Sequence, residues 1–431
     1  MRKMLILAFI GFLAIALQAQ PIREEISQNI RCTASNYMAY PGPVQHRLTP
    51  PPEGKKPFYI SHYGRHGSRY HTQEKSYDVP YHVLATADTL GKLTQLGRDV
   101  LRRVTLIRND ANQRWGELTP LGARQHQQIM RRMVERFPEV FAEGCTVDAR
   151  STIVPRCIMS MENAMVQLMR LRPNIKIHHN ATQRDMYYLN YKSAYLDSLK
   201  KAGLEDRRYD AYCRENNDYE RVMLSLFNDT AYIRQHVDAR QFNTALFKLA
   251  CNIQSIELRN ELTLYDVFTD DELYHNWRQA CARWYVAYGG STFSGSERPY
   301  TQCNLLHRII EQADSCIQLD RPNVHLRYGH EVVVMPLVCL LELNGYGYVT
   351  GELESLERHR WADYRIFPMA ANVQFVFYRE NPQDDDVLVK VLLNENETML
   401  PLKSIIEPYY HWKDVREYYL KKLKAYEEGD R

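Results

Sequence analysis

The chain has 431 residues, of which 45% are hydrophobic and 25% charged, and its formal net charge is +3. This length and composition predict a globular protein of one or two domains with a large core, and they exclude a low-complexity or fibrous chain. Because the net charge is small, it says little about partners, and an anionic ligand must be held by local arginines and lysines. We expect no nucleic-acid partner.

The first 19 residues are typical of a cleavable export signal. Arg2 and Lys3 precede the apolar run 4–17, and Ala19 is a suitable cleavage point. The apolar run is too short for a permanent membrane anchor. We therefore expect a secreted or periplasmic protein without stable membrane insertion, and loss of this segment lowers the net charge to +1.

The nine cysteines lack the spacing of a disulfide framework or a zinc site. Because their number is odd, at least one is unpaired. Cys339, within the apolar run 332–343, is expected to be a buried free thiol. We predict no metal and no cofactor.

Strand and helix patterns alternate in both terminal parts of the chain. The expected strands are the apolar stretch before residue 64 and residues 145–149, 323–328, 370–378 and 387–393. The expected helices are residues 84–109, 120–137, 155–171, 331–343 and 404–426. In between, residues 185–318 show long helical patterns and few strand signals. We therefore predict an α/β core formed by residues 20–184 and 319–431, with an inserted all-α cap at 185–318.

The first candidate site is the loop 65–69, which directly follows the first expected strand. Arg65 and Arg69 present two guanidiniums four residues apart, a spacing that suits a phosphate. His66 lies between them, where it is placed to act as a nucleophile or as a further phosphate contact. Gly64 and Gly67 allow close approach of the backbone to a ligand. A solvated basic loop is the alternative.

Two later strand–helix junctions carry similar chemistry. Arg156 falls in the first turn of a helix, where the helix dipole also favours anions, although it could equally be a surface arginine. His330 and Glu331 begin another helix. There the histidine can bind phosphate and the carboxyl can donate a proton to a leaving alkoxide, whereas a packed, hydrogen-bonded histidine is the alternative.

These motifs together resemble the histidine phosphatase superfamily, in the branch of acid phosphatases and phytases, and most closely the multiple inositol polyphosphate phosphatases. The resembling segments follow the family's order and are residues 65–70, 116–122, 151–160, 329–331, 370–373 and 389–394. The resemblance implies a three-layer sheet core like that of phosphoglycerate mutase, with an α-helical cap.

The resemblance also implies roles for the site residues. His66 would attack phosphorus and form a phosphohistidine, and Glu331 would protonate the leaving oxygen and then help to activate water. The groups around the transferred phosphoryl would be Arg65, Arg69, Arg156 and His330. Arg184 would contact the substrate from the cap side, with a surface salt bridge as its alternative. Further candidates are Lys192, Lys390 and His62.

One position departs from the family pattern. Inositol polyphosphate phosphatases usually place the acid two residues after the histidine, but here Glu331 follows His330 directly and Val332 takes the usual acid position. The adjacent pair is closer to the His-Asp of acid phosphatases. One residue on a helix turns a side chain by about 100°, so the reach of Glu331 becomes the question.

The predicted function is hydrolysis of phosphomonoesters of inositol polyphosphates such as phytate by an exported histidine phosphatase. One alternative is a broad-specificity acid phosphatase acting on sugar phosphates or nucleotides. An alternative of another class is an inactive phosphate-binding module that keeps the arginines. A mutase-like transferase is less favoured in an exported protein. A cysteine phosphatase is less favoured because no His-Cys-x5-Arg loop occurs.

Overall fold

A computed structural model describes residues 21–216 and 218–429, so the predicted export signal lies outside the described residues. Within them, a mixed eight-stranded sheet has the order β10-β8-β7-β1-β5-β2-β3, with β9 paired to β8. Its strands are β1 (Lys56–Arg65), β2 (Thr146–Ser151), β3 (Lys176–Ala181), β5 (Asn323–Gly329), β7 (Asn372–Arg379), β8 (Leu388–Leu393), β9 (Asn396–Glu397) and β10 (Tyr410–His411). A separate short pair is formed by β4 (Gly290–Ser291) and β6 (Val349–Thr350).

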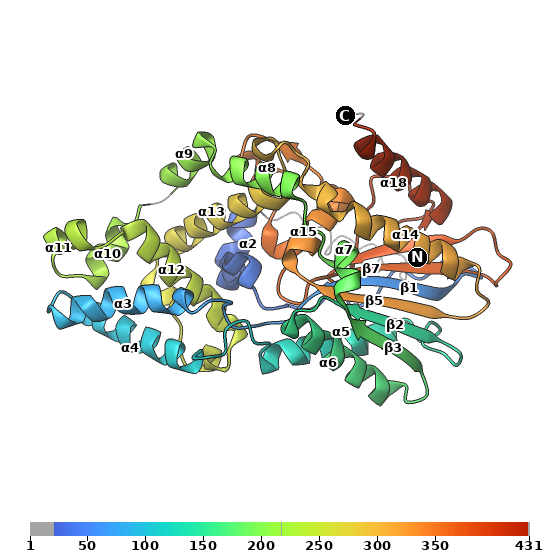
Figure 1. Ribbon diagram of the computed structural model, residues 1–431, viewed down its shortest axis with the longest axis horizontal. Helices are drawn as coiled ribbons and strands as arrows, with labels where there is room; N and C mark the ends of the chain where they lie inside the picture. The colour runs from blue at the N-terminus through green and yellow to red at the C-terminus, as the bar shows by residue number, and fades with distance from the viewer. Residues whose placement is uncertain (1–20, 217, 430–431) are drawn as a thin grey trace, which may run out of the picture.

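Helices cover both faces of this sheet (Figure 1). One face carries α5 (Pro120–Arg136) and α6 (Pro155–Leu171), and the other carries α14 (Cys303–Ile317), α15 (Glu331–Leu340) and α18 (Trp412–Glu427). Successive strand residues point to opposite faces, so Tyr59 packs in one apolar core and Ile60 in the other. The predicted three-layer α/β core is therefore confirmed.

A group of helices lies beyond one end of the sheet, on the left in Figure 1. It contains α3 (Lys75–Thr89), α4 (Gln95–Asp110), α8 (Ala194–Leu204), α9 (Arg207–Glu215), α10 (Glu220–Leu226), α11 (Thr230–His236), α12 (Ala239–Asn252) and α13 (Asp270–Tyr288). The helices α3 and α4, which precede residue 185 in the chain, pack against α12 and α10. Conversely, α14 lies on the sheet. The domain boundaries at 184/185 and 318/319 stay a prediction.

Short helices connect these layers. They are α2 (Ile22–Gln28), α7 (Met186–Leu189), α16 (Ser355–Arg358) and α17 (Asp363–Ile366). The 3-10 turns are η1 (Ile30–Tyr37), η2 (Gln183–Asp185), η3 (Ile253–Ser255), η4 (Glu257–Asn260), η5 (Tyr265–Val267), η6 (Thr292–Ser294), η7 (Arg298–Gln302) and η8 (Leu343–Gly345). None of the helices in the described ranges has the length and apolar character needed to cross a membrane.

Two expected helices have different limits in the structure. The helix expected at 84–109 is two helices, because the chain turns at Gly91 (φ 66°) and Thr94 then caps α4 by accepting a hydrogen bond from the Gly97 N–H. The last helix begins at Trp412 rather than residue 404, since the preceding residues form a turn closed by hydrogen bonds between Ile405, Ile406 and Tyr409.

All nine cysteines are unpaired, and Cys339 is buried as predicted.

The register of the parallel strands β1, β5, β2 and β3 brings their carboxyl ends together at one end of the sheet. Arg65 at the end of β1 lies opposite Gly329 of β5, and Ser151 of β2 lies opposite both Tyr328 of β5 and Ala181 of β3. The residues that follow these strand ends therefore leave the sheet together. In open α/β sheets, ligands bind at the carboxyl ends of the strands.

Candidate active site

The loop that follows β1 is held by backbone hydrogen bonds from both sides. The Arg65 N–H donates to the Ala371 carbonyl (2.7 Å), and the His66 N–H donates to the Gly329 carbonyl (2.9 Å). The His66 carbonyl in turn accepts from the Ala370 N–H (2.9 Å). The His66 ring is fully buried. The position of His66 is thus fixed by the neighbouring strands β5 and β7.

The same loop lies directly against the first turn of α5. A Cβ at Gly67 would come within 2.5 Å of the Gly122 carbonyl oxygen, and a Cβ at Gly122 would come within 2.3 Å of the Ser68 carbonyl oxygen. Both contacts are closer than any side-chain carbon tolerates, so this close approach requires glycine at both positions. The Gly67 N–H donates to Ser160 Oγ of α6 (3.1 Å).

Gln125 is a supporting residue that sequence reasoning missed. Its Oε1 accepts from the Ser68 N–H (2.9 Å), its Nε2 donates to Ser68 Oγ (3.0 Å), and the side chain is 3% exposed. The available signal was a polar residue at a buried helical position, between Gly122 and Ile129 in the apolar spacing of α5. Gln125 thereby fixes the loop between the two arginines.

The guanidinium of Arg65 is buried, and only some of its N–H groups donate hydrogen bonds. Nη1 donates to the carbonyls of Asn36 (2.7 Å) and Phe367 (2.8 Å), and Nε donates to Glu331 Oε2 (3.1 Å). A guanidinium has five N–H donors, and the two that remain are on Nη2, which is buried without a partner among the described residues. A buried donor without a partner is costly, so this atom favours an anionic ligand.

Arg69 and Arg156 leave further donors unused. Arg69 Nη1 donates to the Tyr70 carbonyl (2.9 Å), and its Nη2 lies 3.8 Å from Glu331 Oε1. Arg156 is the second residue of α6, so it projects near the positive end of the helix dipole. Within the described chain, the Nε atoms of both arginines are buried without a hydrogen-bond partner.

The one-residue offset does not keep Glu331 out of the site. As the first residue of α15, Glu331 places Oε2 3.3 Å from His66 Nε2. Val332 packs against the main apolar core instead. The neighbouring His330 is 6% exposed, with Nε2 3.3 Å from Thr152 Oγ1 and 3.7 Å from Cys157 Sγ.

The hydrogen bond of His66 defines its tautomer. His66 Nδ1 lies 2.9 Å from the Gly67 carbonyl, which can only accept, so the proton is on Nδ1 and Nε2 carries the lone pair. That lone pair faces Glu331 Oε2 at 3.3 Å, and two acceptors at this distance repel each other. A proton or an electrophilic phosphorus atom between them removes the repulsion.

Charges around the pair shift its protonation. Burial opposes the charge on Glu331, but the positive charges of Arg65 and Arg69 outweigh it and hold the pKa of the carboxyl well below its ordinary value. Burial lowers the pKa of His66 well below 6.5 and outweighs the opposing effect of Glu331, and the charges of the two arginines act in the same direction as burial. Burial also lowers the pKa of His330 to about 4. Both imidazoles are therefore neutral at neutral pH.

Three residues of the site could also act as metal ligands. His66, His330 and Glu331 each offer one ligand atom, and these atoms lie within 4.8 Å of one another. Arg65 and Arg69 flank the same carboxylate, however, and their charges oppose a bound cation. The group as a whole suits a phosphate better than a metal ion.

The remaining candidates lie outside this cluster. Arg184 is exposed in η2, which follows the carboxyl end of β3, and it forms no ion pair within the described ranges. Lys192 is also exposed. His62 is buried within β1. Lys390 uses all three ammonium protons on Thr49, Glu397 and Tyr409, so it has none left for a substrate.

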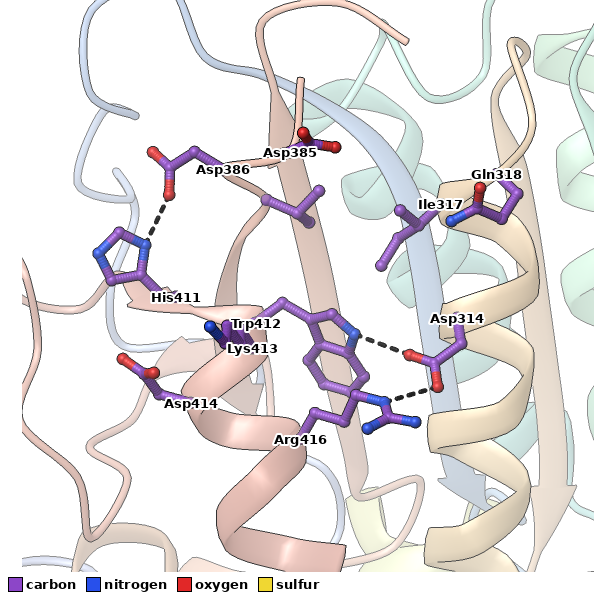
Figure 2. A pocket seen from close by; sticks show the side chains of 11 residues that line it. Asp314, Ile317, Gln318, Asp385, Asp386, His411, Trp412, Lys413, Asp414 and Arg416 are labelled. Atoms are coloured by element: carbon purple, nitrogen blue, oxygen red, sulfur yellow. Dashed lines mark hydrogen bonds and ion pairs between the residues drawn. The ribbon is translucent and has the colours of Figure 1, made fainter. Parts of the chain in front are cut away.

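A pocket of about 520 Å³ lies elsewhere, between the end of α14 and the start of α18 (Figure 2). Several of its polar groups pair with one another: Asp314 accepts from Trp412 Nε1 (3.1 Å) and Arg416 Nε (2.7 Å), and His411 Nδ1 lies 2.6 Å from Asp386. The pocket lies at the edge where β8 begins, opposite the His66 cluster, and its paired, acidic lining does not suit an anionic ligand.

Comparisons with known proteins agree with this geometry. The family model for the histidine phosphatase superfamily (branch 2) matches residues 64–394. A curated relative, multiple inositol polyphosphate phosphatase 1 of Gallus gallus, is 23% identical over 332 residues, which cover 70% of this chain and 68% of the relative.

Solved structures share the fold at low sequence identity. The crystal structure of Bifidobacterium longum multiple inositol polyphosphate phosphatase in complex with inositol hexasulfate has a TM-score of 0.73 and 17% identity, covering 89% of this chain and 96% of that chain. The phytase from D. castellii has a TM-score of 0.63 and 13% identity, covering 91% of this chain and 85% of that chain.

Proposed function

The chain belongs to the histidine phosphatase superfamily (branch 2) and is a phosphomonoester hydrolase, and we propose that it is an exported enzyme that hydrolyses inositol polyphosphates through a phosphohistidine. The observation that carries the proposal is a set of buried guanidinium nitrogens, Arg65 Nη2, Arg69 Nε and Arg156 Nε, which like His66 Nε2 have no hydrogen-bond partner among the described residues. Three buried cationic donors and a nucleophile suit phosphoryl transfer.

In the first step, the non-bridging oxygens of a phosphomonoester bind the guanidiniums of Arg65, Arg69 and Arg156. His66 Nε2 attacks phosphorus, a P–N bond forms, and the P–O bond to the leaving alkoxide breaks. Glu331 supplies the proton that the leaving oxygen takes. Because Glu331 is ionised in the free site, the bound phosphate must first raise its pKa, which follows when a dianion neutralises Arg65 and Arg69.

In the second step, water replaces the departed alcohol. The Glu331 carboxylate takes a proton from this water, which attacks phosphorus and breaks the P–N bond. His66 returns to its starting tautomer because Nδ1 keeps its proton and donates it to the Gly67 carbonyl throughout. Charge on the transferred group is balanced by Arg65, Arg69 and Arg156, and His330 supplies a further contact. These residues need no metal or cofactor for either step.

A basic patch next to the site supports a substrate with several phosphates. The Lys248 side chain is exposed, but partial desolvation lowers its pKa, and the nearby positive charges of Arg283 and Lys75 lower it further. The Lys248 carbonyl accepts from His71 Nε2 (3.2 Å), which places the patch beside the segment that follows Arg69. None of the three cations forms an ion pair in the part of the chain that the structure describes. The relatives named for inositol polyphosphates agree with this choice.

The test is phosphate release by the purified protein, with a chelator present, from inositol hexakisphosphate and from p-nitrophenyl phosphate. We expect both to be hydrolysed, and we expect His66→Ala to abolish trapping of a labelled phosphoenzyme. Glu331→Gln should reduce turnover far more for the inositol ester than for the aryl ester, whose leaving group needs no proton. An equal loss on both substrates would contradict the acid role of Glu331.

The basic patch has its own control. Lys248→Ala should raise KM for inositol hexakisphosphate and leave KM for the aryl ester unchanged, whereas Lys201→Ala, an exposed lysine of α8, should change neither. Activity on the aryl ester alone would indicate a broad acid phosphatase. Activity on neither substrate would indicate a phosphate-binding module.

A further inference from the structure

Asp363 is a buried carboxylate that the proposed chemistry does not use. It is 0% exposed and has no ion-pair partner among the described residues. Its oxygens accept hydrogen bonds from Ser35 Oγ, from Trp277 Nε1 (2.9 Å) and from the Tyr364 N–H (2.8 Å). Burial raises the pKa of this carboxyl to about 6, so keeping an acid here has an energetic cost.

The two segments that Asp363 links are those that hold Arg65. Ser35 directly precedes Asn36, whose carbonyl accepts from Arg65 Nη1 at 2.7 Å. Asp363 begins α17, and the next residue after this helix is Phe367, whose carbonyl accepts from the same Nη1 at 2.8 Å. The Phe367 N–H donates to the Asp363 carbonyl (3.0 Å). Asp363 thus contacts both acceptor segments of the Arg65 guanidinium, Ser35 through its carboxylate and Phe367 through its backbone carbonyl.

The backbone at Ser35 shows how strictly this link is held. Ser35 has φ 54° and ψ −128°, a conformation that favours glycine. A serine persists there with its hydroxyl on Asp363 and its carbonyl accepting from the Met38 N–H (3.1 Å). A strained residue is retained where the surrounding structure over-determines it, often beside a ligand site.

We propose that Asp363 is a positioning residue: through Ser35 and Phe367 it sets the spacing of the two carbonyls that orient Arg65, so that Nη2 points at the substrate phosphate. The proposal rests on the proposed function, since it assumes that Arg65 binds phosphate. Trp277, on α13, holds the other carboxylate oxygen, so the orientation of Arg65 also depends on the helical layer.

The sharpest variant is Ser35→Gly. It removes the hydroxyl but suits the backbone angle, so the fold should keep its stability. We expect the dissociation constant of inorganic phosphate, measured by calorimetry, and KM for p-nitrophenyl phosphate to rise about tenfold with a smaller change in kcat. Asn344→Gly is the matched control, because Asn344 also has a positive φ (51°) and its side chain also makes one hydrogen bond, accepting from the Met399 N–H, far from the site.

Variants at Asp363 separate the acceptor from the charge. In Asp363→Asn the remaining oxygen can still accept from Trp277 and Tyr364, and the new amide can donate to the Ser35 hydroxyl, so phosphate affinity should stay within about threefold of wild type. Asp363→Ala loses all three side-chain hydrogen bonds and should weaken phosphate binding at least as much as Ser35→Gly. In an Arg65→Ala background, Ser35→Gly should have no further effect on kcat/KM.

The outcomes distinguish this inference from the proposed function. If the wild-type protein does not bind inorganic phosphate, the proposed function fails. If it binds phosphate and Ser35→Gly binds it equally well, the positioning role of Asp363 is refuted while the proposed function stands. An equal loss in Asn344→Gly, or a further loss in the Arg65→Ala background, would also refute it.

Discussion

Gly122 gives the most direct test of how the catalytic loop is positioned. A Cβ at this residue would lie 2.3 Å from the Ser68 carbonyl oxygen, and ordinary contact begins at 3.4 Å, so Gly122→Ala must move the loop and α5 apart by about 1 Å. A displacement of this size in an enzyme site can reduce the rate about 100-fold, which is roughly 2.7 kcal/mol in the activation barrier.

Stability should change in the same variant by a separate amount. Alanine in a helix is favoured over glycine by about 1 kcal/mol, whereas forcing a methyl group into a closely packed contact costs about 1–3 kcal/mol. The net loss is therefore small, and the protein should remain folded. The assay is kcat and KM on p-nitrophenyl phosphate per folded molecule, together with urea unfolding.

Gly97 is the matched control because it occupies the same place in α4. Each glycine is the third residue of its helix and donates its N–H to a capping threonine, Thr94 for Gly97 (3.0 Å) and Thr119 for Gly122 (3.2 Å). A Cβ at Gly97 would lie 2.1 Å from the Leu226 carbonyl oxygen, far from the loop. Gly97→Ala should lower stability and leave kcat intact. Wild-type kcat in Gly122→Ala, or an equal fall in both variants, would refute the reasoning.

Buried imidazoles give two predictions for pH dependence. Burial, with the charges of Arg65 and Arg69, lowers the pKa of His66, so the nucleophile stays unprotonated as pH falls. The acid limb of the kcat/KM profile should therefore lie below pH 6.5. A limb assigned to His66 at or above pH 6.5 would contradict this. Burial lowers the pKa of His126 to about 3, so the unfolded chain takes up its proton first and folded stability declines as pH falls from 6.5 towards 3. Urea unfolding at pH 7 and pH 5 measures how much unfolding free energy is lost on acidification, and this loss should be about 2 kcal/mol smaller in His126→Gln than in wild type. His46 is exposed, so His46→Gln should behave as wild type.

Local sequence predicted most of the core elements. The apolar spacing at 155–171 and the Thr-Pro start at 119–120 correspond to α6 and α5 within one residue. Errors arose where a turn interrupts a continuous helical pattern, as at Gly91, or where an irregular stretch precedes a helix, as before Trp412. Periodicity reports which residues could share an apolar face, but backbone angles and capping decide where a helix ends.

For the site, the sequence determined the residue types and their order. The resemblance named His66, the arginines and the adjacent His330 and Glu331. What the sequence left open was whether Glu331 reaches the nucleophile, since that distance depends on how β1 and β5 pair and on where α15 begins.

The supporting residues were decided by tertiary structure alone. Gln125 and Asp363 act across separations of 57 and 328 residues, on Ser68 and Ser35 respectively. Neither belongs to a motif, because a buried polar side chain is recognised only when its partner is known. The sequence by itself therefore determined the chemistry available to this protein. The fold decided how that chemistry is oriented, because close approach and burial turn separate side chains into one site.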